Sequence, residues 1–178
     1  IHHNTGKTEA GAYESTCHLT GDYPHWWEGW QPNRPIRMWA AGETNETTRD
    51  IIQKKLLGEV AYSGQRKGVD GSGMIPAQFI VQDSITWKAG VPDLIDTLKI
   101  KHKLGGLSTL GFKAYSQGRG SMQGTEQDFV WVDEEAPIDV YNEMLLRLMT
   151  TGGRAILTFT PLNGQTELVE SFEESVAR

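Results

Sequence analysis

The sequence predicts one α/β domain with a mostly parallel central sheet, helices on its faces and a β-hairpin insertion. Apolar, strand-like runs alternate with amphipathic, helix-like segments along the chain, and this alternation is typical of parallel sheets. With 178 residues the chain is long enough for one domain with a sizeable core and too short for two comfortable ones. We therefore expect residues 1–178 to fold as a single domain.

Helical spacing predicts the first element, a helix over residues 7–18. Ala10, Tyr13 and Cys17 recur on one face of this segment, which is the pattern of an amphipathic helix. Gly21 then interrupts it.

A buried strand and a second helix follow. Residues 35–41 form an apolar run that predicts the strand. Thr44 or Asn45 can cap a helix over residues 46–57, and Gly58 provides its stop.

The middle of the chain predicts a loop and a β-hairpin. Residues 59–73 are glycine-rich and polar, so we expect a loop there. Residues 98–102 and 107–115 are strand-like and flank Gly105-Gly106, which predicts two antiparallel strands around a turn.

The last third predicts two buried strands and two helices. The apolar residues 127–132 and 155–160 predict the strands, whereas residues 138–149 are amphipathic at helical spacing. Residues 165–177 predict the final helix.

Composition excludes several classes of protein. The net charge is −6, whereas a module whose main task is to hold DNA is usually basic. The single Cys17 excludes an internal disulfide and a cysteine-rich metal site. No apolar run approaches the roughly 20 residues that span a bilayer, so we expect no contact with a membrane.

The first chemical motif is Gly6-Lys7-Thr8, the second half of the phosphate-binding pattern G-x-x-x-x-G-K-[ST]. Gly6 allows the backbone to approach a phosphate, and the amides at the start of the following helix point towards the anion. Lys7 would reach the β- and γ-phosphates, and the Thr8 hydroxyl would ligate Mg²⁺. A helical pattern follows at once, as this chemistry requires.

The second motif is an apolar strand that ends in three carboxylates, Asp133-Glu134-Glu135. Such a strand delivers its end to the carboxyl edge of a parallel sheet, where these folds bind ligands. Asp133 would hold Mg²⁺ through water, and Glu134 would orient and deprotonate the attacking water. Glu135 is the alternative base. Together, the two motifs predict Mg²⁺-dependent ATP hydrolysis.

Several further blocks join these motifs in a fixed order. They are Gly6-Lys7-Thr8-Glu9-Ala10-Gly11, Thr20-Gly21-Asp22-Tyr23-Pro24, Trp39-Ala40-Ala41-Gly42, Tyr115-Ser116-Gln117-Gly118-Arg119, Trp131-Val132-Asp133-Glu134-Glu135 and Thr158-Phe159-Thr160-Pro161. In this combination the chain resembles the ATPase domain of the large terminase subunit of tailed bacteriophages, over nearly its whole length.

The resemblance implies a RecA-like P-loop ATPase of the additional-strand, catalytic-glutamate type. Terminases of this family assemble as a homo-oligomeric ring on the portal protein of an empty procapsid, in the host cytoplasm. They use ATP to pump double-stranded DNA into the procapsid, and they work with a small terminase subunit. We expect the family's upstream adenine-contacting segment and its C-terminal nuclease domain to be absent from this chain.

The resemblance also assigns roles to single residues. Catalytic roles fall on Glu134, Lys7 and Arg119, with Arg119 as an arginine finger in the loop before the acidic strand. Thr158, Phe159 and Thr160 match the motif that couples γ-phosphate state to movement. Metal ligation falls on Thr8 and Asp133. The nucleotide-binding residues are Asn4, Thr5, Gly6, Lys7, Thr8 and Glu9.

The chain departs from the family pattern at its phosphate loop. Ile1 stands where the first glycine of the pattern is expected, and residues 2–5 supply no arginine. Many relatives have a basic residue inside this loop, so Arg119 is the better candidate for an arginine that acts on the phosphates.

Two other functions remain open from the sequence. The first is a helicase or another nucleic-acid-remodelling ATPase of similar fold. The second is a non-enzymatic domain whose phosphate loop holds no nucleotide and which only docks on a portal or small subunit.

Near the first helix, Tyr23, Trp26, Trp27 and Trp30 predict a loop that packs over the sheet, with stacking on a base as the alternative.

Overall fold

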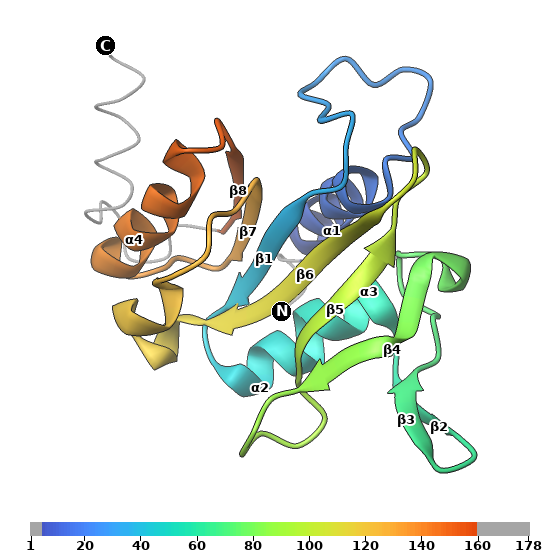
Figure 1. Ribbon diagram of the computed structural model, residues 1–178. Helices are drawn as coiled ribbons and strands as arrows, with labels where there is room; N and C mark the ends of the chain where they lie inside the picture. The colour runs from blue at the N-terminus through green and yellow to red at the C-terminus, as the bar shows by residue number, and fades with distance from the viewer. Residues whose placement is uncertain (1–4, 160–178) are drawn as a thin grey trace.

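The computed structural model describes residues 5–159, and its centre is a six-stranded sheet in the order β4-β5-β6-β1-β7-β8 (Figure 1). The strands are β1 (Arg37–Gly42), β4 (Ile80–Trp87), β5 (Ile95–Lys101), β6 (Leu107–Ala114), β7 (Phe129–Asp133) and β8 (Arg154–Thr158).

Strands β6, β1, β7 and β8 are parallel. Strand β5 pairs antiparallel with β6, and β4 pairs antiparallel with β5 at the edge of the sheet. This confirms the expected mostly parallel sheet and the hairpin around Gly105-Gly106. Because the carboxyl ends of parallel strands meet at one edge, the residues that follow these four strands gather there.

Helices cover both faces of the sheet (Figure 1). On one face lie α1 (Thr5–Thr20) and a continuous helical segment made of α2 (Asn45–Thr47), the π-helical η1 (Thr48–Gln53) and α3 (Lys54–Leu57). On the other face lies α4 (Ile138–Met149). Its bounds are those that the sequence predicted.

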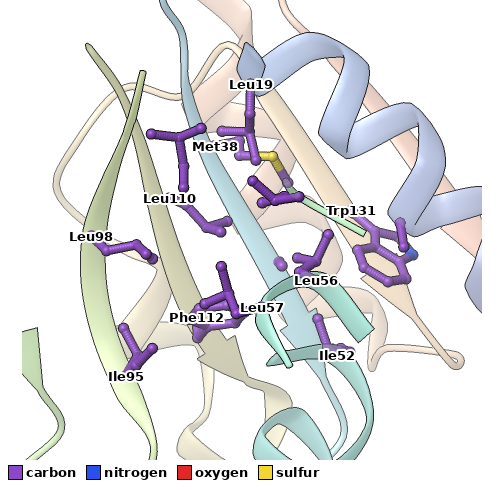
Figure 2. Packing of buried hydrophobic residues seen from close by; sticks show 14 of the residues in the cluster. Leu19, Met38, Ile52, Leu56, Leu57, Ile95, Leu98, Leu110, Phe112 and Trp131 are labelled. Atoms are coloured by element: carbon purple, nitrogen blue, oxygen red, sulfur yellow. The ribbon is translucent and has the colours of Figure 1, made fainter. Parts of the chain in front are cut away.

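Alternation along the central strands separates two apolar cores. Met38 of β1 and Trp131 of β7 pack with Leu19 of α1 and Leu56 of α3 (Figure 2). The intervening residues, such as Val132, face α4 instead. Successive side chains of a strand point to opposite faces, so these near-continuous apolar strands are buried on both sides.

The buried face of α1 differs from the predicted one. Ala10 and Tyr13 are exposed, whereas Ala12 is fully buried. The reason is Gly11, which lies directly against the Trp131 indole, where a Cβ would overlap the ring. Close approach to this indole rotates the helix so that its small residues, rather than Ala10 and Tyr13, meet the sheet.

The helical segment 45–57 begins and ends as predicted. The Thr44 side chain accepts from the Thr47 amide in a reciprocal capping box, and Gly58 ends the segment with φ of 85°. The π turn within it was not predicted. At its start, the Thr48 hydroxyl donates to the Lys113 carbonyl at 2.9 Å, which ties the segment to β6.

The prediction of a loop over residues 59–73 is wrong. This segment contains a small antiparallel hairpin, β2 (Val60–Ser63) and β3 (Arg66–Val69). The Gln82 side chain accepts from the Val69 amide at 3.0 Å and donates to the Val69 carbonyl at 2.8 Å. The Gln82 side-chain amide thus makes the two hydrogen bonds to the Val69 backbone that a neighbouring strand could otherwise make.

Within residues 5–159 there are also three short 3₁₀ helices: η2 (Ala77–Phe79), η3 (Tyr115–Gln117) and η4 (Arg119–Met122). The predicted helix over residues 165–177 lies outside the described residues. The aromatic loop packs as expected, because the Trp27 and Trp30 rings contact the buried His18 of α1, and Trp30 stacks on Phe129 of β7.

Candidate active site

The two sequence motifs meet at the carboxyl edge of the sheet. The Thr8 hydroxyl, in the first turns of α1, donates to Asp133 Oδ1 at the end of β7 across 3.3 Å. Thr8 is 6% exposed and Asp133 is 4% exposed. The prediction that these two side chains converge is therefore confirmed, although they lie far apart in sequence.

A chain of hydrogen bonds orients the Asp133 carboxylate. The Trp131 indole Nε1 donates to the Thr158 hydroxyl at 2.8 Å, and that hydroxyl donates to Asp133 Oδ1 at 2.7 Å. Because Thr158 ends β8, the neighbouring strand is linked directly to the carboxylate. The family resemblance implied a coupling role for Thr158, but the sequence did not predict its hydrogen bond to Asp133.

Burial dominates the electrostatics of Asp133. Loss of solvent raises the pKa of this carboxyl, while the hydrogen bonds from Thr158 and Thr8 oppose the shift. A cation bound beside this carboxylate would compensate its buried charge.

Glu134 is held in an unusual backbone conformation. Its φ is 67°, in the left-handed region that non-glycine residues seldom occupy, and such strain is often found at functional sites. Its amide donates to the Thr158 carbonyl at 3.0 Å. Burial raises the pKa of Glu134, and the negative charges of Asp133 and Glu43 add to the shift, whereas Lys7 lowers it.

Tyr115 anchors this strained turn, and the motif analysis gave it no role. Its buried hydroxyl lies 2.5 Å from the Asp133 carbonyl oxygen and 2.9 Å from that of Ala41, and it shares its proton between them. Burial raises the pKa of Tyr115 well above its usual range, so the hydroxyl keeps that proton. The ends of β6, β1 and β7 are thereby joined at one atom.

The phosphate-loop residues lie beside this carboxyl edge. Lys7 Nζ donates to the Phe159 carbonyl at 3.3 Å, which connects the start of α1 with the residue after β8. Glu9 faces Lys55 of α3, with 3.7 Å between Oε2 and Nζ. Gly6 is exposed, Thr5 begins α1, and Asn4 and Thr160 lie outside the described residues.

A cavity of about 730 Å³ opens next to the two motifs. Thr8, Asp133 and Glu134 line it together with residues that include Lys55 and Met74. Pockets of roughly 300–1,000 Å³ commonly hold small molecules and cofactors. Glu134 lines this cavity and Glu135 does not, which favours Glu134 of the two alternative bases.

Arg119 does not line this cavity. It begins η4, and its side chain contacts Glu143 of α4. The structure therefore brings Thr8, Asp133, Glu134 and Thr158 together and keeps Arg119 apart from them.

Comparison with known proteins identifies the family. Residues 4–176 match the family model described as "Terminase large subunit, T4likevirus-type, N-terminal". The chain belongs to this family. It is also 38% identical over 186 residues to the terminase large subunit of Salmonella phage P22, an alignment that covers 94% of this chain and 36% of that protein. This terminase chain thus spans about a third of the length of that relative.

A solved structure supports the fold. The terminase chain superposes on the ATPase domain of the Thermus phage P74-26 large terminase with a TM-score of 0.54, at 16% identity, over 96% of this chain and 61% of that one. At this identity the likeness shows the fold. Family membership decides for a terminase over the helicase alternative.

Two features are absent from the described residues. Between residues 5 and 159, no helix of the terminase chain is both long and apolar enough to cross a membrane. In the same part of the chain, no group of three or more His, Cys, Asp or Glu side chains is arranged to hold a metal ion.

Proposed function

We propose that this terminase chain binds ATP with Mg²⁺ in the cavity beside Thr8 and Asp133, and hydrolyses it to drive double-stranded DNA into a procapsid. The observation that carries the proposal is the 3.3 Å contact between the Thr8 hydroxyl and the Asp133 carboxylate at the edge of that cavity. The fold of a large terminase ATPase domain supports it.

The residues present fit a magnesium ion. The Thr8 hydroxyl and the Asp133 carboxylate supply hard oxygen ligands, which Mg²⁺ prefers, and Mg²⁺ commonly takes its other ligands from water and substrate phosphates. When bound, the ion would neutralise charge on the β- and γ-phosphates. Thr158 also donates to Asp133 Oδ1, at 2.7 Å, and so helps to hold the carboxylate in place.

Glu134 is the proposed general base. It orients a water molecule for in-line attack and accepts its proton as the water oxygen bonds to the γ-phosphorus and the bond to the β-phosphate oxygen breaks. A pKa raised by burial and by neighbouring negative charges suits a base that operates near neutral pH. Lys7 stabilises the charge that develops on the phosphates.

Arg119 and the coupling residues act beyond the hydrolysis step. Because Arg119 does not line its own cavity, we propose that it reaches the nucleotide of a neighbouring copy in a ring. A finger of this kind accelerates hydrolysis by about 10³–10⁵. Thr158, Phe159 and Thr160 would relay the γ-phosphate state to the moving parts.

The proposed partners are double-stranded DNA, the portal protein and the small terminase subunit. The net charge of −6 supports the view that this chain supplies the ATPase activity, whereas most of the contacts that hold DNA are made elsewhere. Such a motor would work in the host cytoplasm while bound to the procapsid.

The test combines nucleotide binding with turnover. We expect Glu134→Gln to bind ATP as the wild type does and to lose turnover by at least about 10²-fold, because the proton acceptor is removed. Lys7→Ala should lose hydrolysis altogether. A fluorescent ATP titration and a phosphate-release assay measure the two properties.

Glu135→Gln is the matched control, since it makes the same change at the next carboxylate. Loss of turnover in Glu135→Gln alone would assign the base to Glu135. A wild-type protein that binds no nucleotide would support the docking-only alternative instead.

A further inference from the structure

A carboxylate that the proposed mechanism does not use lies beside Arg119. Arg119 Nε donates to Glu143 Oε2 at 3.1 Å. The Glu143 side chain is 6% exposed, whereas that of Arg119 is 61% exposed. A buried carboxylate on α4 thus holds an exposed guanidinium by its inner nitrogen.

The same guanidinium belongs to a largely exposed side chain. Within residues 5–159, the terminal nitrogens of Arg119 make no hydrogen bond, and Nε makes the contact with Glu143. An arginine that binds a phosphate from its open end uses these terminal nitrogens, in a planar fork of donors. The contact with Glu143 therefore fixes the side chain and leaves its phosphate-binding end available.

The backbone around Arg119 is anchored to the same helix. Met122, at the end of η4, is fully buried and packs in the core that contains Val140 and Met144 of α4. The short helix is thus attached to α4 through an apolar side chain as well as through the ion pair with Glu143.

Glu143 already has a structural partner in Arg147, one turn further along α4. Arg147 Nη2 lies 3.6 Å from Glu143 Oε1, and its Nη1 donates to the Gly124 carbonyl at 3.1 Å. This second pair compensates the buried charge from within α4. The bond from Glu143 to Arg119 is thus additional to the pair that stabilises the helix.

We propose that Glu143 is a positioning residue for Arg119, aiming its terminal nitrogens at a nucleotide bound by the neighbouring copy. The proposal rests on the finger role given to Arg119 under the proposed function. Glu143 itself touches no substrate. It lowers the number of orientations that the finger samples before the phosphate arrives, which is how pre-organisation accelerates a reaction.

A double-mutant cycle on ATP turnover tests the proposal in the whole protein. Glu143→Gln keeps the shape of the side chain and removes its charge. We expect kcat to fall about 10- to 100-fold with KM near the wild-type value, because a misplacement of about 1 Å can cost about 10² in rate. Arg119→Ala should lose more.

The combined variant distinguishes positioning from a structural role. If Glu143 acts through Arg119, then Arg119→Ala with Glu143→Gln turns over no more slowly than Arg119→Ala alone. Fully additive losses would overturn the proposal. Glu126→Gln is the matched control, since it removes the same charge from an exposed residue between η4 and β7, and it should keep wild-type kcat.

A second variant covers the case in which Glu143→Gln does not fold. Glu143→Asp keeps the charge beside Arg147 and withdraws it by one carbon from Arg119, so it should also lower kcat and remain non-additive with Arg119→Ala. A wild-type protein without ATP turnover would refute the proposed function itself. If Arg119→Ala lowers kcat but Glu143→Gln and Glu143→Asp do not, only the positioning role is refuted. If Arg119→Ala keeps wild-type kcat, both the finger role of Arg119 and the positioning role of Glu143 are refuted.

Discussion

At the scale of single residues, the buried carboxyl group of Asp133 suits the proposed magnesium site but lowers the stability of the fold when it is charged. Burial raises the pKa of its carboxyl, so the folded protein favours the protonated form more than the unfolded chain does. The stability that this proton provides is fully present below the ordinary aspartate pKa of about 3.9, and it is lost as the pH rises through the folded value. Above that folded value, the ionised carboxylate of Asp133 makes the fold less stable than a neutral side chain in its place would.

Replacement of the Asp133 carboxylate by a neutral side chain should stabilise the protein when no nucleotide is bound. We expect Asp133→Asn to have a higher free energy of unfolding than the wild type at pH 7 without nucleotide, and the gain should shrink as the pH falls towards about 4. Saturating Mg²⁺ and ATP should reverse the order, because ligand at 100 times its Kd stabilises the wild type by about 2.7 kcal/mol. Urea unfolding with and without ligand measures both effects. A ligand-free variant less stable than the wild type at pH 7 would contradict this account.

Tyr115 gives a second prediction at this scale. Tyr115→Phe removes the hydroxyl that lies between the Asp133 and Ala41 carbonyls, and unsatisfied buried acceptors cost about 1–3 kcal/mol. The strained backbone of Glu134 loses its anchor, so we expect turnover to fall while ATP affinity is kept. Urea unfolding and steady-state kinetics check this.

Tyr62→Phe is the matched control, because Tyr62 is 69% exposed on the β2–β3 hairpin. Equal effects of the two substitutions would show that the Tyr115 hydroxyl has no special role.

The residues that sequence reasoning found differ in kind from those that it missed. Thr8 and Asp133 belong to local patterns in which residue type and spacing carry the chemistry, so their meeting could be predicted. Tyr115 and Glu143 act through tertiary contacts, on backbone carbonyls from other strands and on a distant arginine. No local spacing encodes such partners.

At the scale of elements, the helices and strands with the clearest sequence patterns were the ones that could be predicted. The helix α4 has an unbroken amphipathic period, and its predicted and observed bounds coincide. Strand β4 was missed because polar residues such as Gln82 and Asp83 interrupt its apolar run. Strand β3 was missed because its polar, glycine-containing sequence carries little strand pattern, while its pairing with β2 and the bonds from Gln82 to Val69 are tertiary contacts.

The packing of α1 on β7 gives a prediction for elements. Gly11→Ala places a methyl group where the Trp131 indole lies, and overpacking of a core typically costs about 1–3 kcal/mol. Displacement of the indole also weakens its bond to Thr158, so turnover should fall together with stability. Thermal unfolding and phosphate release measure the two losses.

Gly120→Ala is the control for this change, because a Cβ there meets open space. Wild-type stability in Gly11→Ala would show that α1 can move away from β7 without loss.

At the scale of the whole molecule, the fold separates two halves of the proposed catalytic machinery. The cavity with Thr8, Asp133 and Glu134 opens between the carboxyl edge and the α3 side, whereas Arg119 is fastened to α4 on the other face of the sheet. A chain with this arrangement can offer a finger to one neighbour and a nucleotide site to another. Head-to-tail contacts of this kind form a ring when the rotation between neighbouring copies closes.

Mixed assemblies test this division of labour. Lys7→Ala destroys a copy's own site and keeps its finger, while Arg119→Ala does the reverse. Each variant alone should be nearly inactive, because every site then lacks a lysine or a finger. In a random one-to-one mixture, about a quarter of head-to-tail junctions pair an intact site with an intact finger, so about a quarter of wild-type turnover should return. The assay is phosphate release at concentrations where wild-type specific activity rises with protein concentration. A mixture no more active than its components, or full turnover by a strictly monomeric wild type, would mean that Arg119 does not act between copies.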